Sequence, residues 1–152
     1  MTLAVATMTA ALGLCVAAGV DSGSGGEAAF LPWARFTLGW THSRERTRWE
    51  ETYRIDVVQG APRLTLEALR VKGSGAGIDP PPSARWVDGW YVDRPAPRPL
   101  ERLVLTVSAY AADYELCDDR FGSPTTCRAL GTFLNARDSI SLSGCRRPEN
   151  AE

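Results

Sequence analysis

Residues 36–57, FTLGWTHSRERTRWEETYRIDV, contain two segments in which apolar and polar side chains alternate. Phe36, Leu38 and Trp40 form the apolar set of the first segment. The second segment places Trp49, Glu51, Tyr53, Ile55 and Val57 on one face and charged or polar residues on the other. This period of two is typical of a strand with one buried face. The polar residues between the segments are too few for another core element, so we expect two paired strands.

The rest of the chain extends this pattern. Residues 64–72 predict a third strand or a short helix, and their neighbours favour a strand. Asp88 and Gly89 predict a tight hairpin turn, and residues 103–107 alternate cleanly. Further strands are expected at 114–117 and 127–134. Six or seven short strands without a long helical stretch predict an all-β fold, a small antiparallel sandwich or partly closed barrel.

The N-terminus has the features of an export segment. Residues 3–20 carry no charge, and a polar, glycine-rich stretch follows at 21–27. A cleaved signal peptide would leave a mature protein that begins between Ala18 and Glu27. A retained segment would instead anchor the protein to a membrane, because its length is near the lower limit for a span. In either case we expect a periplasmic or extracellular protein.

These features predict four parts, of which only the third is a packed domain. They are a signal peptide or anchor at 1–20, a flexible spacer at 21–32, a β domain at 33–135 and a polar C-terminal tail at 136–152. Seventeen basic and eighteen acidic residues give a formal net charge of -1. Such a balance produces no field that would attract nucleic acid, so we do not expect a nucleic-acid partner.

Four cysteines are present. Cys117 and Cys127 enclose a turn-forming segment, which predicts a disulfide in an oxidising compartment. Cys145 would then be unpaired or bonded to another chain, because Cys15 lies in the expected signal segment. Structural zinc usually needs four closely spaced Cys or His ligands, so we expect no metal, and we expect no cofactor.

One candidate ligand site surrounds His42, the only histidine. Any function that needs a histidine as general base or ligand must use it. The alternative is a structural role in which His42 bonds a backbone group or a glutamate and fixes the hairpin. The other candidate residues of this site are Ser43, Glu45, Glu51 and Tyr53.

A second candidate element is the glycine-rich segment that contains Gly73, Gly75 and Gly77. Successive amide groups in such a loop can bind an anion. It does not fit a nucleotide-binding loop, because no Lys-Ser/Thr pair follows and three prolines prevent an immediate helix. The alternative is a loop whose glycines permit positive φ or close packing. We expect this segment and the His42 turn to lie near one another at one end of the β structure.

Four segments in order, WTHSRERTRWEETYRI, VKGSGAGIDPPP, DGWY and ADYELC, resemble the bacterial domain of unknown function family 1850. The resemblance implies a small exported protein, often encoded beside a tripartite solute transporter that depends on a periplasmic receptor. We therefore expect a non-enzymatic extracytoplasmic accessory or binding module, associated with the transporter's receptor or membrane subunit. The alternative is a small hydrolase-like enzyme that uses His42 and a nearby carboxylate.

Overall fold

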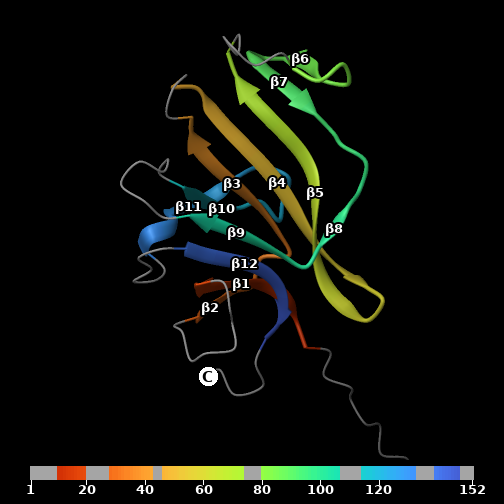
Figure 1. Ribbon diagram of the computed structural model, residues 1–152, viewed down its shortest axis with the longest axis vertical. Coiled ribbons are helices and arrows are strands. Elements are labelled where there is room, and N and C mark those ends of the chain that lie inside the picture. The colour runs from red at the N-terminus through yellow and green to blue at the C-terminus, as the bar shows by residue number, and fades with distance from the viewer. Residues whose placement is uncertain are drawn as a thin grey trace, which may run out of the picture.

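The computed structural model describes residues 10–19, 28–42, 46–73, 80–106, 114–132 and 139–147. These residues form two antiparallel sheets that are not closed (Figure 1), which confirms the all-β sandwich. The larger sheet has the order β11-β10-β3-β4-β5-β7-β6, with β8 beside β5, and the smaller one has the order β2-β1-β12-β9. The strands are β1 (Leu12–Ala18), β2 (Ala28–Leu31), β3 (Arg35–Thr41), β4 (Arg48–Val58), β5 (Ala61–Lys72), β6 (Arg85–Val87), β7 (Trp90–Asp93), β8 (Pro99–Leu100), β9 (Arg102–Thr106), β10 (Glu115–Asp118), β11 (Thr125–Ala129) and β12 (Ser139–Arg146).

The centre of the larger sheet follows the predicted pattern. β3 pairs with β4, and β5 pairs with the other side of β4, so residues 64–72 are a strand and not a helix. Gln59 and Gly60 both have positive φ, 50° and 79°, in the two-residue turn between β4 and β5. That geometry matches the right-handed twist of paired strands. The predicted turn at Asp88 and Gly89 joins β6 and β7 in the same way.

The smaller sheet extends the β domain beyond both predicted boundaries. β1 lies between β2 and β12, and β12 pairs on its other side with β9. Leu14, Val16, Ile140 and Leu142 are fully buried. The segment expected to be a signal and the segment expected to be a tail therefore both supply core strands here. An uncharged apolar run suits an inner strand as well as an export signal, and the apolar residues of SISL alternate with serines.

Both disulfides fix strand pairs. Cys117 and Cys127 lie directly opposite one another on β10 and β11 and are bonded, as predicted. The expectation that Cys145 is unpaired or bonded to another chain was wrong. The pairing of β1 with β12 brings the Cα atom of Cys145 within 5.8 Å of the Cα atom of Cys15, and these two cysteines form a second disulfide. Two disulfides are compatible with an oxidising compartment. Among the described residues, no helix is long and apolar enough to cross a membrane.

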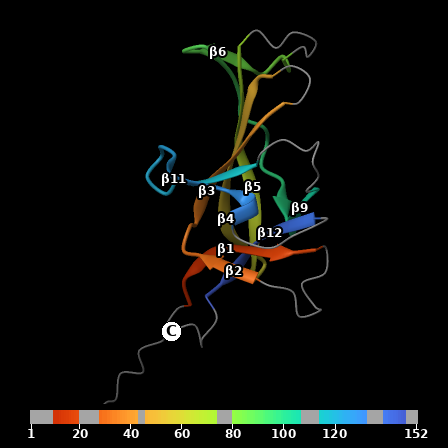
Figure 2. The same ribbon diagram turned by 90° about the vertical axis from the view of Figure 1, so that its left-hand side faces the viewer.

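The smaller sheet covers only part of the larger one. In Figure 2 it lies against the lower half of β4 and β5, whereas β6 lies at the upper end, with β7 beside it in Figure 1. Burial follows this arrangement, because Phe36, Ile55 and Leu64 in the lower half are buried, whereas Trp49 and Val71 near the upper end are only half-buried. β4 and β5, with 11 and 12 residues, are longer than the predicted short strands and project beyond the shared core.

Candidate functional site

The projecting half of the larger sheet presents a continuous inner surface. Trp49 on β4 lies opposite Val71 on β5, which lies opposite Tyr91 on β7. In the neighbouring row, Glu51 lies opposite Leu69, and Leu69 lies opposite Asp93. Directly opposed residues share one face of a sheet. Both rows therefore lie on the face that carries the core farther down the strands.

A hollow of about 120 Å³ separates this surface from residues 80–84. We call it the apolar pocket, and its walls consist of Trp49, Leu69, Val71, Pro80, Pro81, Ala84, Tyr91 and Asp93. The hydroxyl of Ser83 donates a 2.6 Å hydrogen bond to Asp93 Oδ1, which ties the proline segment to β7. An apolar cavity of about 150 Å³ is large enough for benzene. The apolar pocket is somewhat smaller, so it can hold a short hydrocarbon chain or part of a small ring.

Trp49 joins the apolar pocket to a cluster of aromatic rings. Its ring centroid lies 6.1 Å from that of Trp40 and 5.8 Å from that of His42. Trp40 also contacts Tyr114, at 5.8 Å. The indole Nε1 of Trp49 donates to Thr47 Oγ1 at 3.2 Å. These contacts fix the ring of Trp49, so this wall of the apolar pocket is set before any ligand enters.

Glu51 places a carboxylate on the same inner surface. Its neighbours across the strands, Leu38 and Leu69, are both apolar, and the hydroxyl of Tyr53 donates to Glu51 Oε2 at 2.6 Å. Burial raises the pKa of Glu51, and the bond from Tyr53 offsets part of that rise. Burial and the charge of Glu51 raise the pKa of Tyr53 and of Tyr114. A carboxyl group with a raised pKa is a common feature of functional sites, and Glu51 lies opposite Leu69, a wall of the apolar pocket.

The two predicted site elements meet at this end of the sheet. His42 N donates to Thr47 O at 2.9 Å, and a Cβ atom built on Gly73 would lie 4.0 Å from Thr47 Cγ2. Gly73, which has φ 89°, also donates its amide to Gly89 O at 3.1 Å. The described parts of the His42 turn and of the glycine segment are therefore close, as predicted. Ser43, Glu45, Gly75 and Gly77 lie outside the described residues, and their roles stay predictions.

The sequence made Glu51 and Tyr53 candidate site residues but gave no sign of the walls of the apolar pocket. Alternation did place Trp49 on the inner face, but the short hairpin pattern around Asp88 and Gly89 revealed no surface role for Trp86 and Tyr91. The rings of these two residues lie 4.7 Å apart, and Trp86 is exposed. A register shift between Thr52 and Tyr53 sets Leu69 opposite Glu51, and alternation within one strand does not reveal such a shift.

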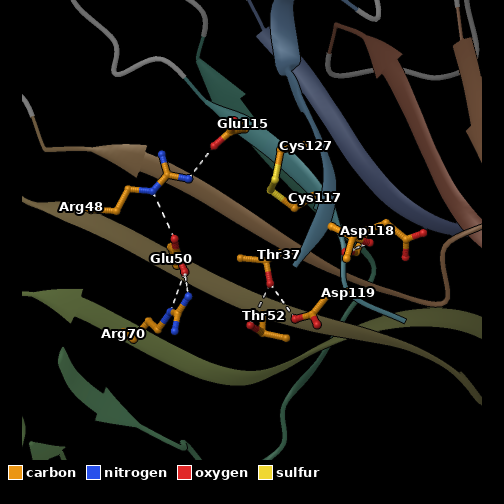
Figure 3. The surroundings of a disulfide bond; sticks show 11 residues. Thr37, Arg48, Glu50, Thr52, Arg70, Glu115, Cys117, Asp118, Asp119 and Cys127 are labelled. Atoms are coloured by element: carbon orange, nitrogen blue, oxygen red, sulfur yellow. Dashed lines mark hydrogen bonds and ion pairs between the residues drawn. A yellow bond between two sulfur atoms is a disulfide. The ribbon is translucent and has the colours of Figure 1, made fainter. Parts of the chain in front are cut away.

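The outer face of the larger sheet carries ion pairs (Figure 3). Arg48 lies 2.7 Å from Glu115 and 3.3 Å from Glu50, and Glu50 also pairs with Arg70. The guanidinium of Arg48 crosses β3 at Gly39, where a Cβ atom would lie 2.6 Å from Arg48 Cζ. This group of ion pairs includes Glu50 but not Glu51, which faces inward and accepts from Tyr53.

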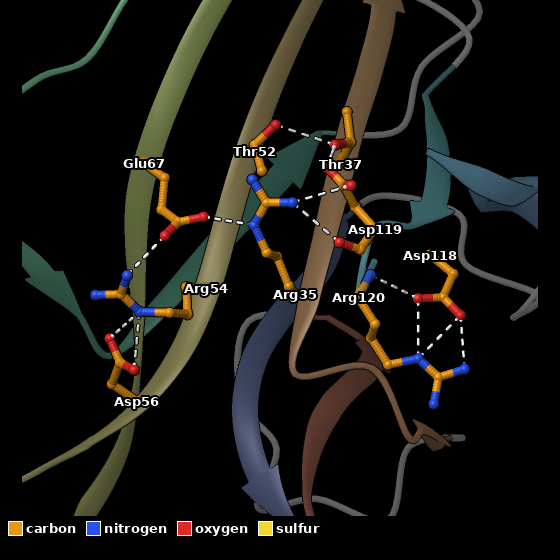
Figure 4. A network of polar contacts seen from close by, with 9 residues as sticks. All are labelled: Arg35, Thr37, Thr52, Arg54, Asp56, Glu67, Asp118, Asp119 and Arg120. Atoms are coloured by element: carbon orange, nitrogen blue, oxygen red, sulfur yellow. Dashed lines mark hydrogen bonds and ion pairs between the residues drawn. The ribbon is translucent and has the colours of Figure 1, made fainter. Parts of the chain in front are cut away.

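A second row of ion pairs crosses the same face (Figure 4). Arg35 lies 3.0 Å from Asp119 and 2.6 Å from Glu67, and Glu67 lies 2.6 Å from Arg54. Thr37 donates to Asp119 Oδ2 at 2.9 Å. Opposite charges therefore meet across this face, and its pairs tie neighbouring strands together.

Glu115, Cys117 and Cys127 have possible metal-ligand atoms within 4.8 Å of one another. Both sulfur atoms belong to the disulfide (Figure 3), and a metal binds the thiolate form of cysteine. This cluster is therefore not a metal site while the disulfide is intact.

The family described as "Domain of unknown function (DUF1850)" matches residues 36–121, more than half of the chain. The matched segment includes β4, β5, β7 and residues 80–84, so it contains every wall of the apolar pocket. No curated protein and no solved structure shows a significant match to the chain. The chain therefore belongs to the domain of unknown function 1850 family, as the order of its sequence segments predicted.

Proposed function

We propose that this protein is a non-enzymatic binding module that works outside the cytoplasm and holds a small apolar compound, or the apolar part of a larger one. The observation that carries this proposal is the apolar pocket of about 120 Å³, which lies beyond the cover of the smaller sheet. Ligand sites are typically concave, mostly apolar and formed in advance. The fixed ring of Trp49 and the bond between Ser83 and Asp93 fit that description.

The size of the apolar pocket also sets the expected strength of binding. Burial of apolar surface contributes about 25 cal/mol per Å², and part of this gain is offset by the cost of association. A ligand of about six heavy atoms should therefore bind weakly, with a dissociation constant roughly between millimolar and micromolar. A larger ligand would gain affinity from contacts with the aromatic cluster and Glu51.

As the second part of the proposal, the module is an accessory of a solute transporter and contacts its receptor or membrane subunit. The support for this part is the gene context that the family implies. Two disulfides are compatible with the compartment in which such receptors work. Co-purification from the native membrane, followed by mass spectrometry, tests this part separately from ligand binding.

The binding part is tested with the oxidised protein and a small-molecule extract of the source cells. Wild-type protein should retain a compound that Val71→Trp does not, because an indole at this position fills the apolar pocket. Val104→Trp is a matched control, since Val104 is an exposed strand residue of the smaller sheet. If wild type and Val71→Trp retain the same compounds, the apolar pocket is not the binding site.

A further inference from the structure

A second hollow, of about 210 Å³, lies where the two sheets meet. It shares no wall with the apolar pocket, and its lining is chemically different. We call it the arginine hollow, and it is lined by Pro62, Arg63, Glu101, Arg102, Ser141, Ser143 and Gly144. Most of these residues carry hydrogen-bonding or charged side chains.

Three strands build the arginine hollow. Ser143 on β12 lies opposite Arg102 on β9, and Ser141 lies two residues before Ser143 on the same strand. Both serines and Arg102 therefore lie on one face of the smaller sheet. β8 pairs with the start of β5, where Leu64 lies opposite Leu100, and this pairing brings the chain that carries Arg102 beside Arg63.

Gly144 allows the two sheets to approach one another at this point. A Cβ atom on Gly144 would lie 3.1 Å from Pro62 Cβ and 3.3 Å from Arg63 N. It would also lie 2.9 Å from a methyl group of Ile55. Any larger residue would push β5 away from β12, so the glycine keeps Arg63 close to the serines.

The guanidinium of Arg63 has donors available in the arginine hollow. Arg102 lies 3.8 Å from Glu101, whose side chain is 73% exposed, so solvent weakens this pair. Arg63 donates to the carbonyl of Pro62 at 2.9 Å, and it forms no ion pair with the part of the chain that the structure describes. A guanidinium has five N–H donors, so this one bond leaves most of its donors available.

We propose that the arginine hollow binds a small oxyanion, a carboxylate or a phosphate group, between Arg63 and Arg102. Arginine presents a planar fork of donors that matches the oxygen atoms of either group. The hydroxyls of Ser141 and Ser143, which line the same hollow on β12, donate to these oxygens. This site does not depend on the apolar pocket, and it can hold a free anion or the acidic end of a larger molecule.

The test is a calorimetric titration of the oxidised full chain with inorganic phosphate and, separately, with acetate. Sodium chloride keeps the ionic strength constant, because general screening would otherwise imitate binding. At least one anion should bind with saturation below about 10 mM. Tighter binding of phosphate identifies a phosphoryl group as the ligand, and tighter binding of acetate identifies a carboxylate.

Arg63→Gln should weaken the binding about tenfold. Arg98→Gln, which removes the same charge from an exposed residue outside the arginine hollow, should leave the binding unchanged. Ser143→Ala keeps every charge and should weaken the binding a few-fold, so it decides the question if Arg63→Gln does not fold. The proposal is wrong if neither anion saturates. It is also wrong if Arg63→Gln and Arg98→Gln weaken binding equally.

Discussion

The hydroxyl of Tyr53 donates a 2.6 Å hydrogen bond to Glu51 Oε2, and both side chains lie on the apolar inner face of β4. This bond satisfies one carboxylate oxygen, yet burial still raises the pKa of Glu51. At neutral pH the folded protein therefore holds Glu51 as a buried carboxylate, and this lowers the free energy of unfolding. Residues that reduce stability are common in binding sites, because selection there acts on function.

Replacement of Glu51 by glutamine should stabilise the protein at pH 7. A carboxyl group with a raised folded-state pKa contributes stability that is present at low pH and is lost as the pH rises through that pKa. Glutamine keeps the size of the side chain and an oxygen that can accept from Tyr53. In urea unfolding, the free energy of unfolding of Glu51→Gln should therefore exceed that of the wild type at pH 7. This difference should vanish below about pH 4.

Glu67→Gln is the control for this comparison, because Glu67 forms ion pairs with Arg35 and Arg54 on the outer face. This change should leave stability at pH 7 unchanged or lower it. A loss of stability at pH 7 in Glu51→Gln would mean that the carboxylate is a structural group.

The two disulfides should differ in their contributions to stability. The cysteine pair Cys15 and Cys145 is separated by 130 positions, whereas Cys117 and Cys127 are separated by 10. Chain entropy in the unfolded state predicts that the longer loop contributes about 5 kcal/mol and the shorter one about 3 kcal/mol. Urea unfolding of the two double Cys→Ser variants measures both values. Equal losses of stability, or a larger loss when the shorter loop is opened, would contradict this prediction from chain entropy.

We expect the functional protein to retain β1. Cleavage between Ala18 and Glu27, as expected from the sequence, would remove the buried Leu14 and Val16 and leave Cys145 without its partner. It would also separate β2 from β12, because β1 lies between them. Intact mass and thiol counting in denaturant should show a chain that includes Cys15 and has no free thiol. A mature N-terminus at 18–27 with one free thiol would refute the retention of β1.

Gly39→Ala should destabilise the protein by about 1 kcal/mol through Arg48. The added Cβ atom would lie 2.6 Å from Arg48 Cζ, so the guanidinium must leave Glu115. In an Arg48→Met background the same glycine change should cost much less. A double-mutant cycle from urea unfolding measures this coupling. Additive losses would show that Gly39 is needed for a different reason.

How much of the structure could be predicted depended on the kind of pattern. Alternation in residues 36–57 was enough to predict β3 and β4, and their pairing follows from the short polar connection. It also placed Glu51 on the inner face. The strand role of residues 12–18 was not predicted, because an uncharged apolar run has the same composition in a signal and in an inner strand. Only the pairing with β12 distinguishes an inner strand from a signal here. Strands that are more than 100 positions apart in the chain leave no local pattern of their pairing.

The apolar pocket was hidden for a related reason. Leu69 and Val71 are ordinary strand residues in the sequence, and the prolines at 80 and 81 predict only a loop. The hollow arises because β4 and β5 project beyond the smaller sheet while Ser83 ties the proline segment to Asp93. Both features depend on contacts between elements that are far apart in the chain.

The most direct test of the proposed binding function is a methyl NMR titration of the oxidised protein with cyclohexanol, a small neutral molecule with an apolar ring. Methyl groups of Leu69, Val71 and Ala84 should show saturable shifts, and these shifts should be lost in Val71→Trp. Shifts that do not saturate, or that appear instead at the buried methyl groups of Leu14 and Ile140, would contradict the proposed binding function.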